Sequence, residues 1–355
     1  MKTEKIVDIF LTLVKIDSPT NFENEVVDYV LEQLQKTTPS VKKDTYGNIY
    51  AYYPGEGEPL FLSAHLDTVE PGRGIHPVIG EEYITSDGST ILGADNKVAL
   101  AVILAAMQEL PSHHRPLELV LTISEEIGNY GAINYDYSLI KSKKGYCFDI
   151  SQPIGTIISA SPYYERFDIT LHGVAAHASQ PEEARPVLQA LQEILSISPL
   201  GRIDADTLFN IGVVEGGQVR NTVLGQVSLK GEIRSFIEDK LTSVKEVFRN
   251  NISKIAQKHN LKIEEDWVRE NPGYKHTSDE SQKFITETQK IMEALTIPSQ
   301  VIDAGGVSDA NIFNDKGLLC INLGDGSEFT HTLKERIAIK DLTLLLQIID
   351  KVIQV

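Results

Sequence analysis

A short apolar segment that ends in two polar side chains decides the fold: residues 59–69, PLFLSAHLDTV. Residues 60–64 are largely apolar and follow the turn-like sequence GEGEP, a pattern typical of a buried parallel strand. Side chains alternate along a strand, so we expect His65 and Asp67 to project to the same side. Polar residues at the carboxyl end of such a strand lie where open α/β sheets bind their ligands. The alternative interpretation is a histidine that merely pairs with a neighbouring carboxylate.

The predicted strand belongs to a region in which apolar strands and helices alternate. Strand patterns occur at residues 49–53, 60–64, 117–124 and 145–149, and helical patterns at about 6–14, 23–34 and 98–107. Such alternation is typical of an α/β domain with a mainly parallel sheet flanked by helices.

The pattern changes near residue 163, where segments such as ERFDITLHG and QVSLKGEIRSF alternate apolar and polar residues. Helical patterns lie between these strands, and helices and buried strands resume from about residue 278. A chain of 355 residues also exceeds the usual size of a single core. We therefore predict one discontinuous domain, 1–161 and 271–355, interrupted by an inserted α+β domain, 162–270.

Composition excludes several classes of partner. The formal charge of −17 argues against a nucleic-acid partner, because binding to phosphates needs clustered Lys and Arg. No segment approaches the roughly 20 apolar residues that span a bilayer, so we expect no membrane partner. Cys147 and Cys320 are too few for a disulfide framework, which favours a reducing compartment. The expected location is the cytoplasm.

Histidines and acidic residues recur at the ends of the apolar segments. They are His65 and Asp67, Asp95 in GADNK, Glu125 and Glu126 in SEE, Asp149 in FD, and His331 in FTHTLKE, and each except His331 closely follows or precedes a strongly apolar segment. Two imidazoles and several carboxylates without a cysteine suit zinc, manganese or cobalt more than a cysteine-rich structural zinc site. Clustered carboxylates are destabilised by repulsion and desolvation unless cations balance them. The pattern predicts a site for a pair of divalent cations.

The order of these motifs resembles the peptidase T-like (tripeptide aminopeptidase) branch of the aminoacylase/carboxypeptidase family of di-zinc metallopeptidases. The motifs are HLD, GADNK, SEE, FD and a late H-x-x-x-E from His331 to Glu335. The segment GGVSDANIFNDKGLLCINLG is similar to that family's glycine-rich stretch before its last metal histidine. The resemblance extends over essentially the whole chain, and five motifs in order are far more specific than one. It implies a zinc-exopeptidase-like catalytic domain and an inserted lid or dimerisation domain.

The resemblance also implies which residues hold two zinc ions, with manganese or cobalt as alternatives. Asp95 would bridge both ions. His65 and Asp149 would complete the protein ligands of one ion. Glu126 and His331 would complete those of the other.

Further roles follow from the same resemblance. Glu125 would be the general base that takes a proton from the attacking water and passes it to the leaving amine. Asp67 would hold the His65 ring by its second nitrogen. A cis peptide bond would follow the bridging aspartate, between Asp95 and Asn96.

Three residues of the inserted domain match positions that face the substrate in relatives. His177 in LHGVAAHASQP would donate to the oxyanion, commonly from the partner subunit of a homodimer; a loop histidine of no consequence is the alternative. Asn221 and Arg234 would contact the substrate, against the alternatives of a turn residue and a surface ion pair. His276, in a turn-like setting, is expected to be solvated.

The function implied by the resemblance is removal of the N-terminal residue from short peptides such as tripeptides. An amidohydrolase of the same fold that deacylates N-acyl amino acids is the main alternative. A non-catalytic peptide-binding relative is the third hypothesis, and the retained base and ligands count against it.

Overall fold

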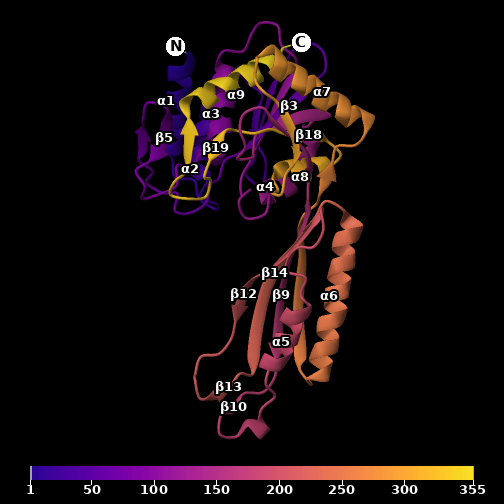
Figure 1. Ribbon diagram of the computed structural model, residues 1–355. Coiled ribbons are helices and arrows are strands. Elements are labelled where there is room, and N and C mark those ends of the chain that lie inside the picture. Colours follow the sequence, from indigo (N-terminus) through magenta and orange to yellow (C-terminus); the bar gives the residue numbers. More distant parts are fainter. Residues whose placement is uncertain (1, 355) are drawn as a thin grey trace. The chain divides into compact units, whose positions relative to one another are not determined.

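The computed structural model describes residues 2–354, which form two compact units (Figure 1). The first unit consists of the residues up to Ala160 and those from Lys275 onward, and the second is Ser161–Tyr274. The predicted insertion, 162–270, lies within the bounds of the second unit.

The first unit is built on a six-stranded sheet in the order β1-β2-β6-β3-β7-β18. Its strands are β1 (Val41–Lys43), β2 (Ile49–Tyr53), β6 (Leu117–Thr122), β3 (Leu60–His65), β7 (Lys144–Cys147) and β18 (Leu319–Asn322). The last four run parallel to one another, whereas β1 and β2 form an antiparallel edge. The predicted α/β fold with a mainly parallel sheet is confirmed.

Helices cover both faces of this sheet. They are α1 (Lys2–Val14), α2 (Asn24–Gln35), α3 (Ala94–Gln108), α4 (Tyr130–Ile133), α7 (Asp279–Ala294), α8 (Asp309–Asp315) and α9 (Ile339–Val352), with a 3-10 turn at Tyr137–Leu139. Leu60 and Leu62 share one apolar core with α1, α3 and α9. Phe61 points the other way and meets Phe313 of α8 edge to face, with the ring centroids 5.6 Å apart. The alternation along β3 thus joins two helical layers through one sheet.

Two smaller sheets complete the first unit. One contains β19 (Ser327–Glu328), β20 (Arg336–Ala338), β5 (Tyr83–Ser86) and β4 (Pro77–Ile79). The other contains β16 (Tyr274–Lys275), β8 (Thr156–Ser161) and β17 (Gln300–Asp303). The chain passes between the units within β8 and at β16.

Parallel strands bring the polar segment ends to one edge of the main sheet. His65 is the last residue of β3, and Glu125 follows the end of β6 within a few residues. Asp149 comes directly after β7 and Phe148, and Asp95 lies in the first turn of α3. Since β3, β6 and β7 are parallel neighbours, their carboxyl ends lie at the same edge of the sheet, where open α/β sheets bind their ligands.

The second unit is an antiparallel sheet with two helices on one face. The strand order is β11 (Gly201–Arg202), β12 (Thr207–Glu215), β14 (Gln226–Ser235), β9 (Tyr163–His172) and β15 (Lys262–Asn271). The helices α5 (Leu188–Ile197) and α6 (Glu238–Lys258) bury their apolar stripes against it, and α6 runs along the strands (Figure 1). A short ribbon of β10 (Ala176–His177) and β13 (Thr222–Val223), with a 3-10 turn at Pro181–Glu183, completes the unit. This is the predicted α+β insertion.

One histidine departs from the sequence-based expectation. His276 is buried, not solvated, and its Nε2 lies 3.1 Å from the carbonyl oxygen of Cys320. The turn that carries it is covered by its own unit, which a local sequence pattern cannot reveal. Separately, no helix within residues 2–354 is long and apolar enough to cross a membrane.

Candidate metal centre

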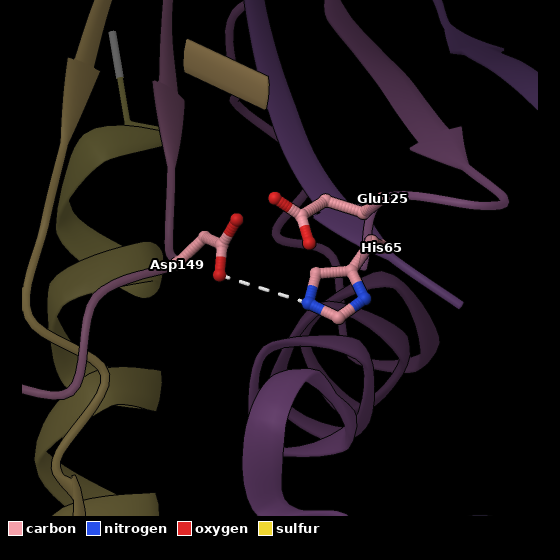
Figure 2. A group of neighbouring side chains, drawn as sticks. All are labelled: His65, Glu125 and Asp149. Atoms are coloured by element: carbon pink, nitrogen blue, oxygen red, sulfur yellow. Dashed lines mark ion pairs between the residues drawn. The ribbon is translucent and has the colours of Figure 1, made fainter. Parts of the chain in front are cut away.

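His65 stands at the centre of the first group of side chains. Its Nε2 lies 3.1 Å from Oδ1 of Asp95 and 3.6 Å from Oδ1 of Asp149. Figure 2 shows the Asp149 carboxylate facing the ring, with Glu125 beside it. One potential ligand atom from each of His65, Glu125 and Asp149 lies within 4.8 Å of the others.

His331 forms a second group around the other oxygen of the same aspartate. Its Nε2 lies 3.1 Å from Oε1 of Glu126 and 3.4 Å from Oδ2 of Asp95. His65, Asp95 and Glu126 also offer ligand atoms within 4.8 Å of one another. The structure therefore brings together all five predicted ligands, with the Asp95 carboxylate between the two histidines.

These separations fit the spacing of ligand atoms around zinc. With metal–ligand bonds of about 2.0–2.1 Å, tetrahedral geometry places neighbouring ligand atoms about 3.3 Å apart. The four contacts between an imidazole and a carboxylate range from 3.1 to 3.6 Å. Each Asp95 oxygen faces a different histidine, which is the arrangement a bridging carboxylate requires. The donor set, nitrogen and carboxylate oxygen without sulfur, is also one that zinc, manganese or cobalt accepts.

The electrostatics of the side chains point to the same conclusion. Burial raises the pKa of Glu126 to about 7, and the nearby Asp95 charge adds to the rise. Burial and the Asp149 charge raise the pKa of Glu125 well above its usual range. Hydrogen bonds with Asp95 and Glu126 raise the pKa of His331 to about 10. Without a metal, the raised pKa values favour protonation of these side chains. Bound divalent cations would supply the positive charge in place of the protons.

Asp67 connects the first histidine to both glutamates. The Nδ1 of His65 lies 3.0 Å from the backbone carbonyl of Asp67 and 3.4 Å from its carboxylate. That carboxylate also accepts the backbone N–H groups of Glu125 and Glu126, at 3.0 and 3.2 Å, and the hydroxyl of Thr20 at 2.7 Å. The fully buried carboxylate thus helps to hold the ring and the following loop in place.

The start of α3, which carries Asp95, is held by Glu335, a residue for which the sequence predicted no role. Glu335 accepts the N–H groups of Leu92 and Gly93, each at 2.8 Å, and that of Asp95 at 3.1 Å. Its place in the late H-x-x-x-E motif was the available signal. The peptide bond between Asp95 and Asn96 is cis, as the resemblance predicted.

Two asparagines hold other site residues and escaped the sequence analysis. Asn322 forms two hydrogen bonds with the backbone of Asp149, accepting its N–H at 3.0 Å and donating to its carbonyl at 2.8 Å. Asn129 donates to the carboxylate of Glu125 at 2.9 Å. Asn129 does not stand out in sequence, because an asparagine in a loop is equally typical of a turn. Asn322 ends β18, and its contact with Asp149 spans 173 positions, so no local pattern marks it.

The three predicted residues of the inserted domain lie in the second unit. His177 is exposed on β10, where its Nδ1 contacts the Ser179 hydroxyl at 2.7 Å and its Nε2 lies 3.3 Å from the amide of Asn221. Arg234 lies on β14, with its guanidinium 4.4 Å from the centre of the Tyr164 ring and bonds to Glu232 at 3.2 and 3.3 Å. Their catalytic and binding roles stay predictions.

Sequence and structure comparisons match this chain to peptidases of one family. Residues 61–355 match the model of peptidase family M20/M25/M40. An uncharacterised protein from Bacillus subtilis, YqjE, is 30% identical over 99% of this chain and 98% of its own length. The crystal structure of a tripeptidase from Staphylococcus aureus matches with a TM-score of 0.95 at 30% identity, covering 99% of this chain and 98% of that one. That of the aminopeptidase PepT from Bacillus cereus matches with a TM-score of 0.90, at the same identity and coverage.

These matches confirm the resemblance predicted from the motifs, and they extend over both units. The match to the family model covers well over half of the chain, from β3 through the last helix. The chain belongs to peptidase family M20/M25/M40.

Proposed function

We propose that this chain is a metal-dependent aminopeptidase that removes the N-terminal residue from short peptides, with tripeptides as its main substrates. The observation that carries the proposal is the Asp95 carboxylate, whose two oxygens face His65 and His331 separately. The similarity of the whole chain to a tripeptidase supports the choice of substrate.

The proposed site holds two divalent cations, with zinc as the first choice and manganese or cobalt as alternatives. Asp95 would be their shared ligand, His65 and Asp149 would complete the ligands of one cation, and Glu126 and His331 would complete those of the other. When bound, such a pair of cations polarises the scissile carbonyl and acidifies a water molecule.

Glu125 is proposed as the general base. Its carboxylate lies within 4.8 Å of the ligand atoms of His65 and Asp149, so it can reach a water held at that position. It accepts a proton from the attacking water and delivers it to the leaving amine. Asp67 positions the His65 ring through Nδ1.

The proposed roles of the second unit follow the family resemblance. His177 donates to the oxyanion, and Asn221 and Arg234 bind the peptide. The incompletely paired outer edge of β12 supports a homodimer through the inserted unit, because an open strand edge can pair with a second copy. Only Leu208 and Phe209 of that strand pair with β11, and Val213 and Val214 beyond them are 37% and 49% exposed. Light scattering on the wild type and on Val214→Lys measures this state, and a monomeric wild type would contradict it.

The test of the base compares Glu125→Gln with the wild type. We expect the variant to keep its two bound cations, measured by metal analysis, and to lose at least about 100-fold in kcat on a tripeptide. Glu109→Gln, a surface change at the far end of α3, serves as the matched control. A fully active Glu125→Gln variant with unchanged metal content would reject the assignment.

The test of the substrate compares free-amino tripeptides with N-acyl amino acids. Hydrolysis of the tripeptides supports the aminopeptidase, whereas cleavage of the acylated compounds alone would favour the same-fold amidohydrolase. Stoichiometric metal without hydrolysis of either panel would favour a non-catalytic relative.

Two buried free thiols, Cys147 and Cys320, support a reducing compartment such as the cytoplasm.

A further inference from the structure

Asn129 lies behind the proposed base and contacts two carboxylates with a single amide group. Its Nδ2 donates to Oε1 of Glu125 at 2.9 Å and to Oδ1 of Asp309 at 3.0 Å. The side chain is only 1% exposed, so water does not compete for these bonds. An amide nitrogen carries two hydrogens, and here each has a carboxylate acceptor.

One acceptor of this amide, Asp309, is itself held in place. Asp309 is buried in the first turn of α8, and its other oxygen accepts the hydroxyl of Thr122 from the end of β6. The N-cap residue Ser308 fixes the start of that helix with its side chain. Asp309 therefore anchors the Asn129 amide from a rigid element of the main fold.

The backbone forms a tight turn between Glu125 and Asn129. The N–H of Asn129 donates to the carbonyl of Glu125 at 2.8 Å, and Asn129 has a φ of +57°. Asparagine adopts this left-handed conformation at lower cost than most residues with a side chain. Asn129 thus binds Glu125 twice: its backbone N–H donates to the carbonyl, and its side-chain amide donates to the carboxylate.

We propose that Asn129 is the positioning residue of the general base, which extends the function proposed above and rests on it. By engaging Oε1, the amide fixes the rotamer of Glu125 and leaves Oε2 as the oxygen that exchanges the proton with water. Asp309 holds the amide in turn. Asparagine is required because alanine offers no donor and aspartate would present a third carboxylate to the other two.

The first experiment is a double-mutant cycle on the metal-loaded enzyme with a tripeptide substrate. We expect Asn129→Ala to lower kcat by about 10- to 100-fold, with KM and bound metal within about twofold of the wild type, because a base displaced by about 1 Å loses that much. In a Glu125→Ala background, assayed for residual turnover at high enzyme concentration, the same change should cost less than about twofold. Asn134→Ala removes an exposed amide bond near the same turn and should have no effect.

A second variant separates positioning from folding. In the exchange Asn129→Asp with Asp309→Asn, the amide at 309 can still bond to residue 129 and to Thr122, so the packing contact survives. The carboxylate at 129 cannot donate to Glu125. We expect this variant to stay folded and to keep its metal content, and to lose activity at least as strongly as Asn129→Ala, because two carboxylates now face each other at residues 125 and 129.

The outcomes separate the two levels of the proposal. If Asn129→Ala is fully active, if its loss is equally large in both backgrounds, or if the exchanged variant is as active as the wild type, Asn129 does not position the base. These results leave the aminopeptidase function standing as long as Glu125→Ala loses most of its turnover. If Glu125→Ala retains full activity, the base assignment and this inference both fall.

Discussion

Substitution of Glu335 by glutamine tests whether a buried carboxylate holds the start of α3, which carries Asp95. Glu335 is 1% exposed and accepts three backbone N–H groups, two through Oε2 at 2.8 Å and one through Oε1 at 3.1 Å. Glutamine has one acceptor oxygen in place of two. If that oxygen keeps the bonds to Leu92 and Gly93, its NH2 group faces the N–H of Asp95, and a buried donor loses its acceptor.

The size of the effect follows from these three bonds. Hydrogen bonds to a charged group contribute about 1.5–3 kcal/mol each, and neutral ones about 0.5–1.5 kcal/mol. One bond is lost and two are weakened, but the burial that raises the pKa of Glu335 shows that the charge itself carries a desolvation cost. We expect a net loss of about 2–3 kcal/mol in the free energy of unfolding. Metal affinity should fall about 10- to 100-fold, as for other groups that hold a ligand in place.

Urea unfolding monitored at pH 8 measures the first quantity, and titration of the metal-stripped protein with zinc measures the second. Glu109→Gln is the control, because Glu109 at the other end of α3 forms an exposed pair with Lys5 at 2.9 Å. Such a pair contributes about 0–1 kcal/mol. The reasoning is refuted if Glu335→Gln unfolds at the wild-type urea midpoint and binds zinc as tightly.

Three further changes probe the centre and its surroundings. Thr20→Val removes the hydroxyl that donates to Asp67 at 2.7 Å, so zinc affinity should fall about 10-fold, with Thr20→Ser restoring it; equal affinities would contradict the contact. Burial lowers the pKa of His276 below its usual 6.5, so the folded state binds the neutral imidazole more favourably than the charged one. That contribution is present above about pH 6.5 and is lost as the pH falls through the lower, folded-state pKa. Stability measured from pH 7 to 5 should therefore fall less steeply in His276→Gln than in the wild type, and parallel profiles would exclude this cause. Chelation should lower the thermal midpoint and abolish peptidase activity, because a cation at 100 times its Kd adds about 2.7 kcal/mol; an unchanged midpoint would argue against a resident metal.

Much of the fold is visible in local sequence because burial imposes local periodicity. The strand at 49–53 and the start of the strand at 60 lie where the apolar pattern predicts them. The helix predicted from residue 98 begins earlier, at Ala94, since its first turn carries the polar residues of the site and lacks the apolar signal. The strand predicted at 145–149 ends at Cys147, so Asp149 lies in the loop beyond the sheet.

The candidate ligands could also be named from sequence, because each except His331 follows or precedes a buried segment and parallel strands share one edge, and the family resemblance added His331. His65 and Asp67 are two residues apart, so strand geometry alone predicts that they face the same way. The sequence by itself therefore determined the class of fold, and it predicted the chemistry of the centre and the residues that carry it.

Apart from Asp67, which the family resemblance assigned to His65, the tertiary structure alone decided which groups hold those residues. Asn129 and Asp309 are 180 positions apart, and Glu335 meets Leu92 across 243 positions. No periodicity records such contacts, because they depend on how α8, α3 and the loops pack around the sheet. Buried polar groups must find partners wherever the fold places them, and only the packed chain shows which partner each one has.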